Sequence, residues 1–125
     1  MKWTNALATG HELIDQQHRG LFECLAELET ATAEQRTLLA VYSITRLKHY
    51  VREHFETEER VMKQCKFPKL AQHVLEHEKF RAKMVELQNK AIVLDVSAEM
   101  VEFLGDWLVN HISRSDMEYV PYLQK

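Results

Sequence analysis

Apolar residues recur at every third or fourth position along most of this chain of 125 residues, with polar residues between them. That period is typical of amphipathic α-helices. Since the chain has only three glycines, two prolines and short β-branched runs, the sequence predicts a mostly helical protein. The first helix is expected to begin near Asp15, a residue type that is favourable as an N-cap. Four apolar residues would then share one of its faces: Leu21, Phe22, Leu25 and Leu28.

A second and longer helix is predicted after Thr32. The Thr-x-x-Gln pattern of Thr32 and Gln35 resembles a capping box, in which each side chain binds the other residue's backbone amide. We expect this helix to run to about Gln64. Its inward stripe contains Ala40, Leu47, Val51, His54, Glu58 and Met62.

Phe67 and Pro68 mark the break before a third helix, because proline disfavours helical geometry in the preceding residue and suits a first helical turn. The third stripe contains Leu70, His73, His77, Phe80, Met84, Leu87 and Ala91. A fourth helix is expected from Ser97, taken as its cap. Its inward set contains Val101, Leu104, Leu108 and His111.

Four amphipathic helices with short connections favour an all-α, antiparallel up-down four-helix bundle. The length is that of one domain, and we expect residues 1–125 to form it. An N-terminal arm of about residues 1–13 would precede the helices. A tail of about residues 116–125 would follow them and pack across the bundle.

The composition is that of an ordinary globular domain, with 46% hydrophobic and 28% charged residues. A net charge of −3 provides no basic surface for nucleic acid or anionic lipid, and no apolar run is long enough to span a bilayer. We therefore expect a cytoplasmic monomer with no nucleic-acid partner and no membrane insertion. Cys24 and Cys65 lack a C-x-x-C spacing and are expected to be packing residues or free thiols.

The candidate chemistry lies in histidines and carboxylates that interrupt the apolar stripes. Residues four apart share one face of an α-helix, so His54 with Glu58, and His73 with His77, can each direct two ligands inward. Polar groups buried in a bundle are costly unless they bind hydrogen-bond partners or metal. Any one of them has an ordinary alternative: each histidine as a hydrogen-bonded residue, and Glu58 as a solvated carboxylate. Together they predict a two-metal site, and the full set is His18, His54, Glu58, His73, His77, His111 and Asp116.

At these residues the chain resembles the hemerythrins, specifically the single-domain bacterial kind, over nearly its whole length. The matching signatures are Trp3 followed by Gly10-His-Glu-Leu-Ile-Asp-Gln-Gln-His18, His54-Phe-x-x-Glu-Glu-x-x-Met62, Phe67-Pro68, His73-x3-His77, and Trp107-x3-His-Ile-x3-Asp116. All seven ligand positions have the residue types that the family pattern requires. His11 and His49 are extra histidines that the pattern does not require, and we expect both to face solvent or to lie outside the ligand shell.

The resemblance implies how the ligands are shared between two iron ions. His73, His77 and His111 would bind one iron, and His18 and His54 the other. Glu58 and Asp116 would bridge the two, together with an oxo or hydroxo group. The first iron then has six ligands and the second has five, so one position stays open on the iron held by His18 and His54. Zinc prefers four ligands, whereas a pair bridged by two carboxylates fits iron or manganese, and the majority of histidines favours iron.

The function that the resemblance implies is reversible O2 binding, as hydroperoxide, at the five-coordinate iron, for carriage, storage or delivery. NO or azide-like small anions are further possible ligands. The candidate apolar neighbours that would exclude water from the pocket are Ile14, Phe22, Phe55, Trp107 and Ile112, and the alternative for each is an ordinary core residue.

Two other functions stay open at this point. One is an O2 or redox sensor that acts through a partner, although the chain has no room for a fused signalling element. The other is a diiron peroxidase or ferroxidase. The histidine-rich set lacks the paired Glu-x-x-His pattern of carboxylate-rich diiron bundles, so we expect a protein that is not an enzyme.

Overall fold

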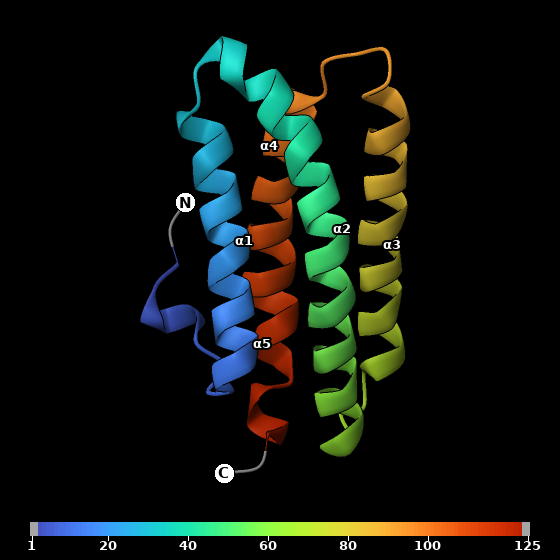
Figure 1. Cartoon of the computed structure of the whole chain (residues 1–125). Coiled ribbons are helices and arrows are strands. Elements are labelled where there is room, and N and C mark those ends of the chain that lie inside the picture. The colour runs from blue at the N-terminus through green and yellow to red at the C-terminus, as the bar shows by residue number, and fades with distance from the viewer. Residues whose placement is uncertain (1–2, 124–125) are drawn as a thin grey trace.

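The structure is a computed structural model that describes residues 3–123. Its four long helical runs stand side by side, and each runs antiparallel to the next along the chain (Figure 1). The helices are α1 (Glu12–Thr30), α2 (Ala33–Gln64), α3 (Leu70–Lys90), α4 (Ser97–Trp107) and the short α5 (Asp116–Glu118). A π-helical segment, Leu108–Ser115, joins α4 to α5, and 3-10 turns lie at Asn5–Leu7 and Val120–Tyr122. This arrangement confirms the predicted up-down four-helix bundle.

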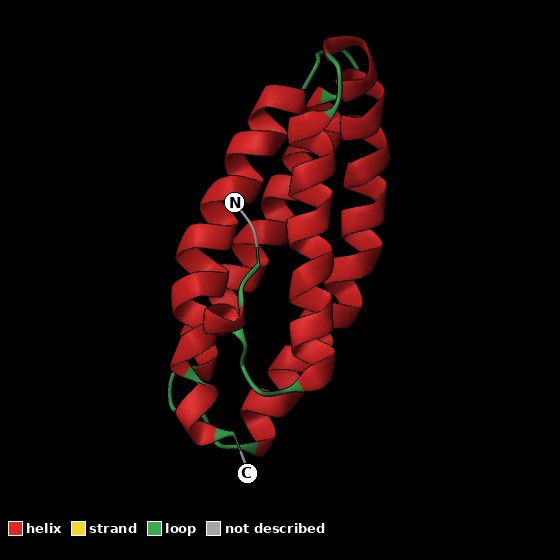
Figure 2. Cartoon of the chain, turned by 90° about the vertical axis from the view of Figure 1, so that its left-hand side faces the viewer, coloured by secondary structure: helices red, strands yellow, loops and turns green. Residues whose placement is uncertain are grey.

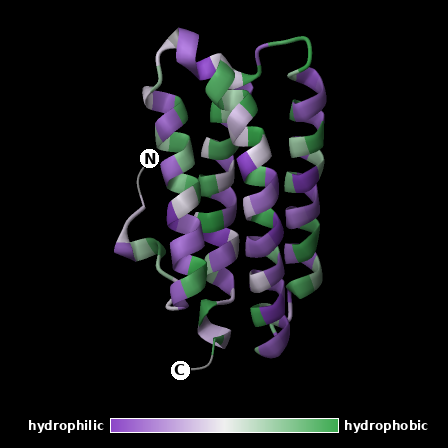
Figure 3. Ribbon diagram, viewed as in Figure 1, coloured by the Kyte–Doolittle hydropathy of each residue, from purple (hydrophilic) through white to green (hydrophobic). Residues whose placement is uncertain are grey.

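Only helices and loops occur among residues 3–123, as Figure 2 shows from a second side. Helix α1 packs against α2 and α4, and α2 also packs against α3. Apolar and polar positions alternate around each helix (Figure 3), so one face of each can be buried. Burying a leucine or phenylalanine side chain contributes roughly 1.5–3 kcal/mol, and this drives the helices together. In the described part of the chain no helix is long and apolar enough to cross a membrane.

The apolar stripes that the sequence predicts are the ones that form the core. The stripes of α1 and α2 are buried throughout, and in α3 the stripe is buried from His73 to Leu87. At its two ends Leu70 and Ala91 are half-buried. In α4 the residue that points inward is Met100, which is fully buried, whereas Val101 is half-buried. The predicted stripe of the fourth helix is therefore wrong by one position at its start.

Helix α1 begins one turn earlier than the sequence predicts. His11 is its N-cap, and its Nδ1 accepts a hydrogen bond from the backbone amide of Ile14. The carboxylate of Asp15 instead accepts hydrogen bonds from the amide and hydroxyl of Thr9, at 2.8 and 2.7 Å. Gly10, at φ +91°, allows the chain to turn back so that these groups meet. The prediction of Asp15 as N-cap is wrong because its carboxylate anchors the N-terminal arm.

The start of α2 is as the sequence predicts. Thr32 and Gln35 form both hydrogen bonds of the capping box. At α4 the cap prediction is displaced, because Ser97 is the first helical residue and Val96 is the N-cap. The carboxylate of Asp95 accepts a hydrogen bond from the Ser97 amide at 2.9 Å, and so supplies the acceptor that the sequence assigned to serine.

The fourth helical run continues beyond α4 without a break in helical backbone, through the π-helical segment and α5 to Glu118. Its backbone includes a bond from the Asp116 amide to the carbonyl of His111, five residues earlier. Such bonds widen the helix and bring residues five apart onto one face. The sequence predicted a tail from about residue 116, whereas helical structure extends three residues further.

Candidate metal centre

Seven buried side chains from four helical runs meet at one end of the bundle. His18 comes from α1, His54 and Glu58 from α2, His73 and His77 from α3, His111 from the π-helical segment and Asp116 from α5. None is more than 2% exposed. They are the seven residues that the sequence selected as metal ligands, and the fold brings all of them together.

Local helix geometry explains how each pair is oriented. His54 with Glu58 and His73 with His77 are four residues apart, a spacing that places both side chains on one face of an α-helix. His111 and Asp116 are five apart, and in an ordinary α-helix they would point about 140° away from each other. The π-helical segment removes this mismatch. The helix distortion is therefore what lets one run supply both a histidine and a carboxylate.

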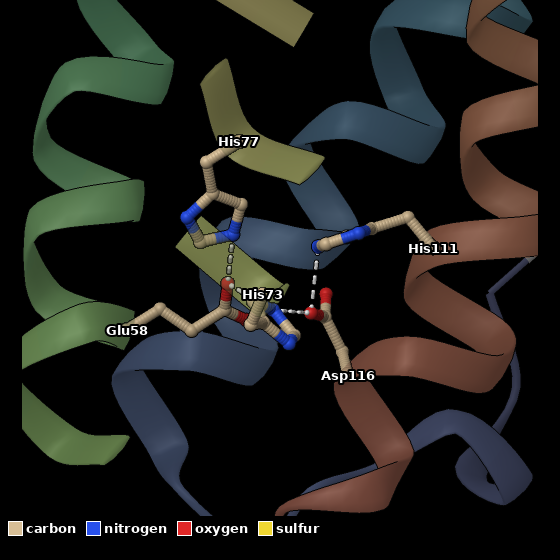
Figure 4. Close-up of side chains that lie close together, drawn as sticks. All are labelled: Glu58, His73, His77, His111 and Asp116. Carbon is tan, nitrogen blue, oxygen red and sulfur yellow. Dashed lines mark ion pairs between the residues drawn. The ribbon is translucent and has the colours of Figure 1, made fainter. Parts of the chain in front are cut away.

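Three histidines surround one side of the two carboxylates (Figure 4). The Nε2 atoms of His73 and His111 lie 2.7 and 2.8 Å from Oδ1 of Asp116. The Nε2 atom of His77 lies 2.8 Å from Oε1 of Glu58. These five residues form one group whose ligand atoms lie within 4.8 Å of one another.

Two histidines lie on the other side, against the remaining carboxylate oxygens. Nε2 of His18 is 3.0 Å from Oδ2 of Asp116 and 3.4 Å from Oε2 of Glu58. Nε2 of His54 is 3.8 Å from the same Oε2. His18, His54, Glu58 and Asp116 make a second group of ligand atoms within 4.8 Å. Each carboxylate thus turns one oxygen to the three-histidine group and the other to the two-histidine group.

Most of the nitrogen and oxygen atoms that face the centre of this cluster lack hydrogen-bond partners. Several lie close to one another, yet those contacts do not have hydrogen-bond geometry. The buried atoms without a partner include Nε2 of His18, His73, His77 and His111, Oε1 of Glu58, and both oxygens of Asp116. Unpartnered buried polar atoms are rare in proteins and cost roughly 1–3 kcal/mol each. Imidazole nitrogens and carboxylate oxygens are ligands for first-row transition metals, so the donor set fits metal ions at its centre.

The outer nitrogens of three histidines are held by side chains that the sequence alone did not identify. Nδ1 of His54 lies 2.7 Å from the amide oxygen of Gln17, and Nδ1 of His77 lies 2.7 Å from Oε2 of Glu59. Glu76 is 3.1 Å from Nδ1 of His111. An acceptor at Nδ1 keeps the proton there and leaves Nε2 free to bind a metal.

Charge and burial act against each other within this cluster. Burial lowers the pKa of His18, but contacts with Asp116 and Glu58 outweigh it and raise that pKa to about 10. The same balance raises the pKa of His73 to about 10 and of His111 to about 9. At His54 burial dominates and lowers the pKa to about 4. Burial alone would raise the pKa of Glu58, yet the neighbouring histidines hold it well below its usual value.

The sequence matches a known family of proteins. The family model of the hemerythrin HHE cation binding domain matches residues 9–123. The chain belongs to the hemerythrin family. It is 34% identical over 127 residues to the bacteriohemerythrin of Methylococcus capsulatus, covering 98% of this chain and 96% of that protein. It is 29% identical over 117 residues to the myohemerythrin of Riftia pachyptila, covering 94% and 88%.

The fold of the solved hemerythrins is similar over the whole chain. A crystal structure of wild-type hemerythrin superposes with a TM-score of 0.81 at 30% identity, covering 100% of this chain and 98% of that one. The structure of a hemerythrin variant gives a TM-score of 0.87 at the same identity and coverage. The resemblance noted in the sequence is therefore confirmed, and the buried cluster of this hemerythrin suggests iron as its metal.

A further polar residue of the site was not identified from the sequence. Tyr119 is fully buried, and its hydroxyl donates a hydrogen bond to Oε2 of Glu58 at 2.8 Å. The sequence predicted only that the tail would pack across the bundle. Tyr119 follows Asp116 by three residues, but the sequence placed both in a tail and not in a helix, so this spacing gave no sign of the contact.

The five apolar neighbours chosen from the sequence differ in their contacts. Phe55 stacks on the ring of His77 with ring centroids 3.8 Å apart, and Trp107 stacks on His111 at 3.9 Å. Ile112 and Phe22 are buried in the main core. Ile14 belongs to a smaller apolar cluster with Tyr119.

The extra histidines and the cysteines lie outside the ligand cluster. His11 caps α1 and is half-buried, and His49 is exposed. Both cysteines are free; Cys24 packs in the core, and Cys65 is half-buried at the end of α2. Cys24 is therefore a packing residue, one of the two roles that the sequence predicted.

Proposed function

We propose that this hemerythrin binds O2 reversibly at a pair of iron ions and serves in its carriage, storage or delivery. In this proposal His73, His77 and His111 hold one iron, and His18 and His54 hold the other. Glu58 and Asp116 bridge them, with a solvent-derived oxo or hydroxo group as the third bridge. Membership of the hemerythrin family supports this assignment.

The observation that carries the proposal is the unequal sharing of ligands across two carboxylates. Asp116 turns Oδ1 to His73 and His111 and Oδ2 to His18. With three bridging atoms, three histidines would give one iron six ligands. Two histidines and the same bridges would give the other iron five, so the His18–His54 side would keep one position for a small ligand.

Iron bound here would supply the electrons and the open coordination position that O2 requires. The protein's own groups prepare the site for it. Gln17, Glu59 and Glu76 hold the outer nitrogens of three histidines, so the inner nitrogens face the metals. The Tyr119 hydroxyl donates a hydrogen bond to Oε2 of Glu58 and would hold that carboxylate in the bridging orientation.

Exclusion of water is the second contribution of this chain. Phe55 lies flat against His77, Trp107 lies flat against His111, and Ile112 is fully buried in the adjoining core. An apolar enclosure keeps bulk water and additional protons away from a bound ligand. This supports reversible binding over turnover of the ligand, and we propose no enzymatic activity. Small anions such as azide, and NO, would compete for the same position.

The test is a visible absorption spectrum of the iron-loaded, anaerobically reduced protein before O2, after O2 and after purging with argon. We expect a charge-transfer band that appears with O2 and disappears on purging, with recovery of the reduced spectrum. A band that does not reverse, or direct conversion to the oxidised protein, would contradict O2 carriage and favour a redox sensor or an oxidase.

A further inference from the structure

Helices α1 and α2 approach closely where Gly20 faces Tyr50. A Cβ atom at Gly20 would lie 2.8 Å from the Tyr50 hydroxyl oxygen and 3.2 Å from its ring, so a side chain at position 20 would require Tyr50 to shift. Glycine inside a helix is about 1 kcal/mol less favourable than alanine. Gly20 lies in the middle of α1, so its presence there is explained by the room that it leaves for the phenol of Tyr50.

The hydroxyl of Tyr50 is buried at this contact and has no hydrogen-bond partner. Its burial raises the pKa of the phenol above the usual value. A buried hydroxyl normally finds a partner, because leaving one unmet is unfavourable. Tyr50 therefore packs between α1 and α2 without forming a hydrogen bond there.

Hollows lie on both sides of this contact. One, of about 490 Å³, extends along the helices towards Cys24 and Tyr42. The other, of about 450 Å³, extends in the opposite direction past Gln17 to Leu13. Gly20 and Tyr50 line both of them. The phenol of Tyr50 therefore separates two open spaces between α1 and α2.

Tyr50 also lies beside the two-histidine side of the metal centre. It precedes His54 by one helical turn, and their ring centroids are 6.3 Å apart. Gln17, which lines the second hollow, contacts Nδ1 of His54 at 2.7 Å. On the opposite side, His77 and His111 are covered by the stacked rings of Phe55 and Trp107. Two neighbours of His54, Gln17 and Tyr50, are only half-buried.

We propose that Tyr50 is the gate through which small ligands pass from the α1–α2 hollows to the His18–His54 side of the centre. In the closed position the hydroxyl of Tyr50 lies against Gly20. The Tyr50 side chain has no hydrogen bond to break, so it can move aside at low cost, as a gate must. This inference rests on the proposed function, since it concerns access to the position left open beside His18 and His54.

The test is the rate at which azide binds to the oxidised, iron-loaded protein and leaves it, in the wild type and in Tyr50→Ala. A gate controls passage in both directions, so the association and dissociation rates should both rise, by about tenfold, with the dissociation constant unchanged. The matched control is Tyr42→Ala, because Tyr42 lines the first hollow but does not line the second. Its rates should equal those of the wild type.

A second variant, Tyr50→Phe, tests the hydroxyl by a measurement that does not involve ligand binding. Removal of an unpartnered buried hydroxyl should leave the urea midpoint of unfolding the same or higher. A lower midpoint would show a structural hydrogen bond and overturn the account of Tyr50.

The outcomes separate the gate from the proposed function. Azide that binds normally, with unchanged rates in Tyr50→Ala, overturns the gate and leaves the proposed function standing. A change in the dissociation rate alone would show that Tyr50 contacts the bound ligand, and would also overturn the gate. Absence of azide binding to the wild type would count against the proposed function itself, and the gate would fall with it.

Discussion

The hydroxyl of Tyr119 donates a hydrogen bond to Oε2 of Glu58 across 2.8 Å, although the two residues are 61 positions apart in the chain. The contact connects the end of the fourth helical run to a proposed bridging ligand in α2. Hydrogen bonds to charged groups contribute roughly 1.5–3 kcal/mol to stability. Tyr119 is therefore a positioning residue for Glu58.

We expect Tyr119→Phe to lower the free energy of unfolding of the iron-loaded protein by roughly 1–3 kcal/mol, because it removes the hydroxyl and keeps the ring. The protein should still bind two irons per chain. Urea unfolding and iron analysis measure the two effects. Tyr122→Phe, at an exposed position in the same segment, is the control. Equal stability of the Tyr119 variant and the wild type would contradict the role given to the hydrogen bond.

Replacement of Glu58 by alanine should remove iron from both positions, because this carboxylate turns one oxygen to each histidine group. Stability should fall as well, since metal binding is coupled to folding. The matched control is Glu56→Ala, two residues away in α2 but exposed, which should keep two irons per chain. Iron analysis and thermal unfolding give the comparison. Normal iron content in Glu58→Ala would count strongly against the bridging assignment.

Ile112→Ala should accelerate autoxidation of the O2-bound protein more than it changes iron content. Ile112 is fully buried beside the ligand His111, and truncating it would admit water. Leu87→Ala removes an equally buried side chain of the same core that lies in α3, two to three turns beyond His77. Both changes should lower stability by roughly 2–5 kcal/mol, but only Ile112→Ala should shorten the lifetime of the O2-bound spectrum. Equal autoxidation rates would mean that Ile112 is ordinary packing.

Metal loading should release protons. In the metal-free protein, contacts with Asp116 and Glu58 overcome burial and raise the pKa of His18 and His73 to about 10. These two histidines, and His111 with a pKa of about 9, are thus charged at pH 7.5. A bound metal requires their neutral forms, so loading should release about three protons per chain. An indicator dye in weakly buffered solution measures the release, and no release would contradict these charge states.

The same shifts predict how the stability of the metal-free protein depends on pH. Raised pKa values mean that the charged histidines stabilise the fold fully below pH 6.5, and that this contribution is lost as pH rises through about 9 to 10. His54 acts in the opposite sense below pH 6.5, since burial lowers its pKa to about 4. The melting temperature of the metal-free protein should therefore fall between pH 7 and 10. That of the iron-loaded protein should fall less, because metal replaces those protons.

Periodicity was sufficient to predict the helices and most of the site. The apolar stripes define the buried faces, and the four-residue spacing of His54 with Glu58 and of His73 with His77 has a direct structural meaning. The spacing of His111 and Asp116 has no such meaning in an α-helix. It becomes intelligible only with the π-helical segment, whose backbone bond from Asp116 to His111 places them on one face.

The features that the sequence did not predict depend on contacts between distant segments. Tyr119 meets Glu58 only because the end of the chain folds against α2. Asp15 has the residue type of a helix cap. Because the chain turns at Gly10, however, its carboxylate accepts hydrogen bonds from the amide and hydroxyl of Thr9 instead. Glu59 and Glu76 sit beside ligands in the sequence, yet which ring nitrogen each one holds depends on the packing of α2, α3 and the π-helical segment.

We propose that one protein chain offers a single ligand position on a pair of irons. The most direct test is the amount of O2 taken up by the reduced protein, measured against its iron content, with recovery of that O2 under argon. We expect one O2 for every two irons, all of it released on purging. One O2 per iron, or uptake that argon does not reverse, would contradict it.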